Sequence, residues 1–204
     1  MRIHHLFEGT VAVDTLRQYA NDPDMFVTFT DMLKVGINPQ TEWDDPIGIY
    51  TYPVRETLEG FASGVPLYGA HRPYIHLVRS TGRMLELQAV PERLFEESVE
   101  PLTLLLGNAD LVEYTMTMFN LSRQPGERIW SATRRLALQI GTQTKRDPKV
   151  LWNKIFRTMG YDAVSDRGES IISDNEPAQA VFLGTAALKV VQAIRNDLFS
   201  KPRG

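Results

Sequence analysis

The feature that most constrains the fold is a change of pattern along the chain, from strand-like segments to helical ones and back. Residues 25–31, MFVTFTD, alternate in character as a strand with one apolar edge does. From residue 91 onward the apolar residues recur at helical spacing, and short strand-like segments return after Gly160. This order is typical of an α+β fold. We therefore predict one domain over residues 1–204 with a helical insertion at about 91–146.

Short apolar segments bounded by turn residues mark the other strands. Residues 73–80 and 83–90 read as a hairpin across Thr81-Gly82. The predicted strands besides 25–31 are 48–52, 73–80, 83–90, 161–165, 169–173 and 178–183.

Two helices have clear boundary signals. Residues 10–22 read as a short helix that ends at an Asn-Asp-Pro-Asp turn. Asp147 suits an N-cap, Pro148 the first helical position and Gly160 a left-handed C-terminal cap. The broad apolar face of this second helix includes Val150, Leu151, Trp152, Ile155, Phe156 and Met159. Residues 185–199 fit either a helix or a strand, and we predict a helix.

Composition excludes several classes of function. The chain has no cysteine, which rules out disulfides, thiol catalysis and thiolate metal sites. The four histidines do not stand at metal-ligand spacing, and no phosphate-binding glycine loop is present, so we expect no metal. No apolar run reaches membrane-spanning length, and the N-terminal residues do not resemble a signal peptide. A cytoplasmic protein that does not bind membranes is the expectation.

Residues 48–52, GIYTY, are the first candidate for a binding site. Tyr50 and Tyr52 lie on the same face of a strand because side chains repeat every two residues. They either cover a core with their hydroxyls at its rim, or they stack on a flat ligand. Gly48 would let a ligand or a neighbouring strand approach the backbone closely.

The second candidate lies at the entry to the strand at 178–183. Glu176 stands between Asn175 and Pro177 immediately before this apolar segment, and Gln179 is a polar residue at its start. A fixed carboxylate or amide at such a place can orient a hydroxyl group or stabilise positive charge developing on a sugar.

Two blocks of sequence resemble the ADP-ribosyltransferase-like fold of bacterial and phage proteins. GYDAVSDRGESIISDNEPAQAVFL, residues 160–183, is similar to the closing segment of that fold, and FVTFTD with GIYTYP is similar to its pocket-lining strands. GINPQ and PIGIYTYP near the front, together with the closing block, also look like a group of uncharacterised tailed-phage proteins. The resemblance implies a split β-sheet core.

This resemblance also implies an activity, the transfer of ADP-ribose from NAD⁺ to a host protein or nucleic acid in the host cytoplasm, with no metal. Glu176 or Gln179 would take the catalytic position, and the resemblance leaves the choice between them open. Tyr50 would stack on nicotinamide, with Tyr52 in support. Gly48 would allow close backbone approach, and Thr28 and Thr30 would contact ribose. From the preceding loop, Asn38 or Trp43 would be available to touch the ligand.

Two alternatives remain beside the transferase. One is a non-enzymatic phage interaction or virion-associated protein that keeps the fold. Its helical block would supply a basic surface made of Arg123, Arg128, Arg134, Arg135, Lys145 and Arg146. The other is a nuclease or glycosylase using Asp162, Asp166 and Glu176, which would need more basic charge than a chain with a net charge of −3 carries. The oligomeric state is left open.

Overall fold

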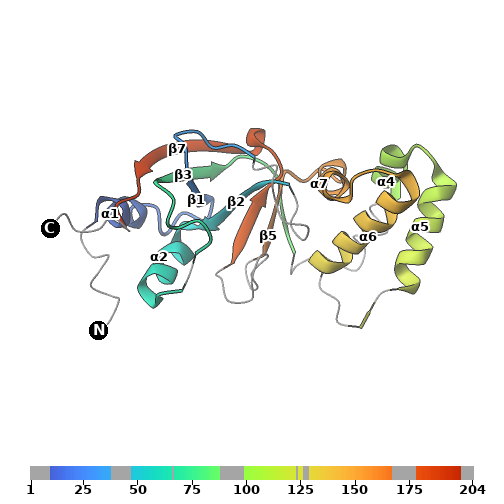
Figure 1. Ribbon diagram of the computed structural model, residues 1–204, viewed down its shortest axis with the longest axis horizontal. Coiled ribbons are helices and arrows are strands. Elements are labelled where there is room, and N and C mark those ends of the chain that lie inside the picture. Colours follow the sequence, from blue (N-terminus) through green and yellow to red (C-terminus); the bar gives the residue numbers. More distant parts are fainter. Residues whose placement is uncertain are drawn as a thin grey trace.

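The computed structural model describes residues 10–37, 47–65, 67–87, 99–122, 124–125, 129–166 and 178–198. Within these ranges the chain forms a mixed α+β fold with a seven-stranded sheet and six α-helices (Figure 1). The α+β class and the helices between the early and late strands agree with the predicted order of elements.

The sheet has the strand order β4-β5-β6-β2-β1-β3-β7. The strand pairs are antiparallel except for β4 and β5, which run parallel to each other. The strands are β1 (Met25–Thr30), β2 (Ile49–Pro53), β3 (Tyr74–Ser80), β4 (Met84–Glu86), β5 (Ala163–Asp166), β6 (Gln179–Phe182) and β7 (Leu188–Arg195).

The helices form two groups in the fold (Figure 1). The first group lies beside the β1 half of the sheet, and the second gathers at the opposite end of the molecule, near β5. The first group is α1 (Val11–Arg17) and α2 (Val54–Ser63), and the second is α4 (Val99–Leu106), α5 (Ala109–Leu121), α6 (Ile129–Thr144) and α7 (Pro148–Thr158).

Both helix groups pack on the same face of the sheet. Tyr52 belongs to the core formed with α1 and α2, whereas Tyr50 packs against the core formed with α4 to α7. Because Tyr50 and Tyr52 are two residues apart on β2, their side chains share one face. β2 therefore lies under the seam between the two helix groups.

The opposite face carries a smaller apolar cluster. Phe26 and Phe182 meet there edge to face, with ring centroids 5.5 Å apart. Among the described residues this cluster draws on strands and on the 3-10 turn Thr185–Ala187, and no α-helix contributes to it.

Several predicted elements are confirmed with small shifts of their ends, namely the strands at 25–31, 48–52, 161–165 and 178–183 and the helix at 10–22. The α7 boundaries are confirmed in detail. Asp147 accepts a hydrogen bond from Lys149 N at 2.9 Å, and Gly160 has a φ of +82°. The predicted strand at 169–173 lies outside the described residues.

The predicted hairpin between residues 73–80 and 83–90 is wrong. Both segments contain strands, but β3 pairs with β1 and β7, whereas β4 pairs with β5 at the other edge of the sheet. The turn at Thr81-Gly82 therefore connects two strands that are not neighbours.

The predicted helix at 185–199 is also wrong. Residues 188–195 form strand β7, and the register against β3 shifts between Leu77 and Val78. Gln192 pairs with Leu77 and Val190 with Val78, so Val191 is an extra residue on β7. Such a bulge breaks the two-residue alternation by which a strand is recognised.

Candidate functional site

The sheet brings together Tyr52 and Gln179, two of the predicted site residues. The buried Tyr52 hydroxyl accepts a hydrogen bond from Gln179 Nε2 at 2.9 Å and another from Tyr68 N at 2.8 Å. Their side chains share the face that carries the helices, because Val181 pairs with Tyr50 and Gln179 lies two residues before it. The contact thus lies near the seam between the helix groups.

A buried carboxylate lies beside this contact. Asp166 pairs with Gln179 in the β5–β6 ladder and is only 3% exposed. β6 runs antiparallel to both β2 and β5, so the end of β2, the start of β6 and the end of β5 lie side by side at the same end of these three interior strands. Glu176, Asn38 and Trp43, the other predicted residues for this region, lie outside the described residues.

Gly48 is enclosed by the neighbouring strand and not by an open pocket. A Cβ atom at this position would lie 2.5 Å from Val181 Cγ1 and 2.8 Å from the carbonyl oxygen of Phe182. Gly48 was predicted to allow close approach of either a ligand or a neighbouring strand. These distances favour the neighbouring strand.

Thr28 and Thr30 point away from the tyrosines. Val27 pairs with Tyr52, so the side chains of Val27 and Tyr52 share one face of the sheet. Thr28 and Thr30 alternate with Val27 and Phe29 along β1, so their side chains lie on the opposite face. Thr28 and Tyr50 are therefore separated by the sheet. As a set, the predicted ribose and nicotinamide contacts do not converge on one described cleft.

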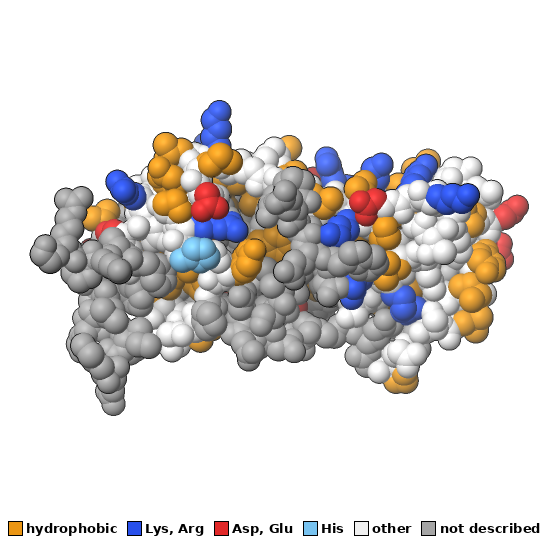
Figure 2. Space-filling view, in the orientation of Figure 1, with side chains coloured by type: hydrophobic (Ala, Val, Ile, Leu, Met, Phe, Trp, Pro, Cys, Tyr) orange, Lys and Arg blue, Asp and Glu red, His pale blue; other side chains and the backbone are white. Residues whose placement is uncertain are grey.

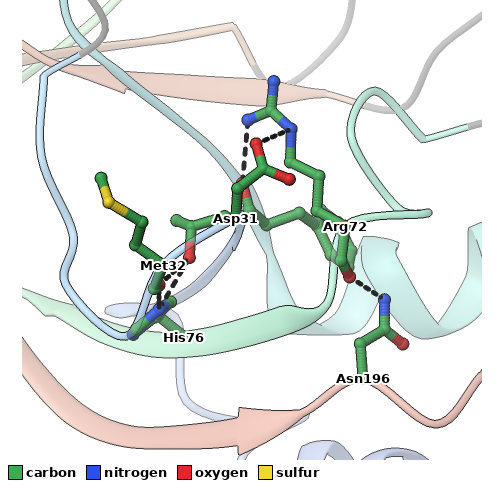
Figure 3. Close-up of polar contacts among 7 residues, drawn as sticks. Asp31, Met32, Arg72, His76 and Asn196 are labelled. Carbon is green, nitrogen blue, oxygen red and sulfur yellow. Dashed lines mark hydrogen bonds and ion pairs between the residues drawn. The ribbon is translucent and has the colours of Figure 1, made fainter.

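Thr30 belongs instead to a polar cluster at the end of β1, together with Met32 and His76, which Figure 3 labels. Its hydroxyl donates to the carbonyl oxygen of Met32 at 2.6 Å, and His76 Nε2 lies 2.9 Å from the hydroxyl oxygen and 3.1 Å from the same carbonyl. Since the carbonyl only accepts, His76 Nε2 carries the proton. The remaining ring nitrogen, Nδ1, is buried and has no hydrogen-bond partner among the described residues.

Arg72 also belongs to this cluster, where it contacts Phe29 and Asp31 near the end of β1. Its Nη1 donates to the carbonyl oxygen of Phe29 at 3.1 Å, and its Nε lies 3.6 Å from Asp31 Oδ2 (Figure 3). Asn196 Nδ2 donates to the carbonyl oxygens of Ala70 and Arg72 at 2.6 and 2.7 Å. Most of these partners are main-chain atoms, so the cluster ties together the ends of β1, β3 and β7.

A second kind of site is a groove of about 530 Å³ that runs along α7. The described residues that line it come from α7, from the segments that flank β2 and β6, and from the segment after β1. They are Ile37, Ile47, Val150, Asn153, Lys154, Arg157, Thr158 and Leu183.

The amphipathic sequence of α7 builds this groove. Leu151, Trp152, Ile155 and Phe156 are buried against the helical core, whereas Lys154 and Arg157 are exposed. Val150, predicted in the apolar face, is 40% exposed and lines the groove instead. Asn153 Nδ2 fixes the opposite wall by donating to the carbonyl oxygens of Ile47 and Leu183 at 2.6 and 3.1 Å.

The charge of this region is opposite in sign to that of the chain. Residues 145–157 contain five lysines and arginines and one acidic residue, although the chain has a net charge of −3. Lysine and arginine side chains gather on the surface over α7 and the neighbouring helix ends (Figure 2). Neither Lys154 nor Arg157 forms an ion pair within the described ranges.

The basic surface predicted for the helical block differs from this arrangement. Arg135 Nη1 donates to the carbonyl oxygen of Phe119 at 3.1 Å, and its guanidinium lies 4.3 Å from the Phe119 ring centroid. Arg146 Nη1 donates to the carbonyl oxygen of Leu105 at 3.3 Å. Arg123 and Arg128 lie outside the described residues.

Lys154 and Arg157 were missed, and their three-residue spacing on the polar side of an amphipathic helix is the signal that could have found them.

Other site classes find little support in the described part of the chain. No group of three or more acidic or histidine side chains is placed there to hold a metal ion. Of the helices in these ranges, none has the length and apolar character needed to cross a membrane.

Comparisons with known proteins identify no family. No family model matches the chain, and no curated protein does. A crystal structure of an anti-CRISPR protein is similar over 83% of this chain and 94% of its own, with 13% sequence identity and a TM-score of 0.40. That TM-score is too low to establish a common fold.

Proposed function

We propose that this chain is a non-enzymatic binding protein that receives the acidic groups of a partner in the groove along α7. The observation that carries the proposal is the pair of exposed cations, Lys154 and Arg157, on the wall of that groove. The described lining residues include no carboxylate that could neutralise them.

Four arginines on the sheet half of the molecule provide a contrast. Arg17, Arg55, Arg72 and Arg79 each lie within 4.0 Å of an aspartate or glutamate oxygen, at distances from 2.7 to 3.6 Å. Their charge is thus balanced within the chain, whereas no carboxylate of the described residues pairs with Lys154 or Arg157. Opposite potentials favour encounter with an acidic partner and fix its orientation.

Retention on immobilised heparin at low salt tests the proposal. The wild-type protein is expected to bind the column despite its net negative charge, and Lys154→Gln combined with Arg157→Gln is expected to abolish retention. The matched control is Lys189→Gln with Arg195→Gln, which removes one lysine and one arginine at exposed positions away from the groove. Equal loss of retention in both double variants would refute a specific role for the groove.

Transfer of ADP-ribose from NAD⁺ by an ADP-ribosyltransferase-like domain is the second candidate. The contact between Tyr52 and Gln179, with Asp166 beside it, favours this function because a buried amide and a carboxylate can position a sugar hydroxyl. Calorimetry with NAD⁺ should then give a binding isotherm that Tyr50→Ala and Gln179→Leu weaken. Label transfer from NAD⁺ to a host lysate should also fall in Glu176→Ala. No heat of binding with folded wild-type protein would exclude this candidate.

A further inference from the structure

The aliphatic lining of the α7 groove points to the class of partner, and this inference rests on the binding function proposed above. Ile37 and Val150 line the groove and are each 40% exposed. Ile47, which is half-buried, adds further aliphatic surface on the opposite wall. The groove thus offers two cations beside an apolar strip, and a partner that only neutralises charge would leave this strip in contact with water.

We propose that the partner is an acidic amphipathic helix of another protein. Lys154 and Arg157 are three residues apart, so their side chains lie on neighbouring turns of the same face of α7. Carboxylates three or four residues apart on a partner helix have the same spacing, about 5–6 Å. Apolar side chains on the adjoining stripe of that helix would cover Val150 and Ile37.

Nucleic acid fits this groove less well. Proteins that bind single strands without sequence preference stack the bases on aromatic side chains, and the described lining residues include no aromatic one. A duplex presents a regular row of phosphates and draws most of its affinity from many cationic contacts. Two cations beside an aliphatic strip match a helix with one acidic and one apolar stripe better than either nucleic acid.

Fluorescence anisotropy with labelled peptides tests the inference. The probe is an amphipathic peptide of about 18 residues, about 27 Å long as a helix, with leucines on one face and glutamates beside them at three- and four-residue spacing. Two matched peptides replace either all glutamates by glutamine or all leucines by serine. A labelled DNA duplex of similar length is the fourth probe.

We expect the acidic amphipathic peptide to bind, and each matched peptide to bind about three- to tenfold more weakly, because both stripes contribute. Lys154→Gln with Arg157→Gln should weaken binding of the acidic peptide by a similar factor, and Val150→Ser should weaken it without affecting heparin retention. Binding that tolerates the leucine-to-serine change, or tighter binding of the duplex, would overturn the inference.

The two proposals fail in different ways. If heparin retention depends on Lys154 and Arg157 but no peptide binds, the groove is an anion site and the helical partner is wrong. If heparin retention does not depend on these two residues, the binding function itself is wrong. Circular dichroism of each variant confirms that the fold is intact, which we expect because Lys154 and Arg157 are exposed.

Discussion

Replacing Tyr52 with phenylalanine tests the contact near the seam between the two helix groups. The substitution removes one oxygen atom and keeps the ring, so it leaves no sizeable cavity. The lost hydroxyl accepts hydrogen bonds from Gln179 Nε2 and from Tyr68 N. Both donors would lose this acceptor, and the Gln179 side chain is buried.

The expected cost follows from these two donors. A buried donor left without its acceptor costs about 1–3 kcal/mol. Tyr68 is 54% exposed, so water can partly replace the acceptor for its amide, which places the total near the lower end of the combined range. We predict that Tyr52→Phe lowers the free energy of unfolding by about 2–3 kcal/mol. For a chain of this size, the melting temperature would fall by about 4–12 °C.

Urea unfolding followed by circular dichroism measures this change. Tyr68→Phe is the matched control, because it removes the same atom from an exposed side chain and should change the free energy of unfolding by less than about 0.5 kcal/mol. A loss below about 0.5 kcal/mol for Tyr52→Phe as well would show that its hydroxyl does not hold β2 to β6 as described.

Three further predictions concern the sheet, a surface ion pair and a helix cap. Gly48→Ala should destabilise by about 1–3 kcal/mol in thermal unfolding, because its Cβ would meet the backbone of β6, whereas Gly36→Ala, with no atom within 4 Å of the added Cβ, should not. A hydrogen bond from Arg79 holds the pKa of Asp22 below its usual value, so the stabilisation is present above pH 4 and is lost as the pH falls through the lowered pKa. Arg79→Gln should move the pKa of Asp22, measured by NMR titration, up toward 3.8, and an unchanged pKa would contradict this. Asp147→Ala should cost about 1 kcal/mol in urea unfolding, and no loss would mean that its side chain does not cap α7.

Local patterns predicted those elements whose signals lie within the element itself. In α7, Asp147, Pro148 and Gly160 each have the side chain or backbone freedom that their position requires. The α+β class followed from the order of patterns along the chain. By contrast, α2 was not predicted, although Pro53 stands at its N-cap and Gly64, with a φ of +73°, at its C-cap.

Long-range arrangement accounts for the wrong and incomplete predictions. The turn at Thr81-Gly82 indicated a hairpin, but the partners of β3 and β4 are set by contacts with β7 and β5, which local sequence does not encode. In β7 the bulge at Val191 hides the alternation of a strand. For the site, the shared face of Tyr50 and Tyr52 was predictable from their spacing, but the separation of Thr28 from Tyr50 depends on the β1–β2 register.

The parallel pairing of β4 with β5 bears on how the chain folds. Leu85 lies opposite Val164, and the chain between them includes α4 to α7. Closing a loop of about 80 residues costs about 2.5 kcal/mol more in chain entropy than closing a four-residue turn. Helix contacts such as those of α6 with α7 join residues much closer in sequence, so we expect the helices to assemble first and to bring the two strands together. The helical block would then be the folding nucleus of the sheet edge that it covers.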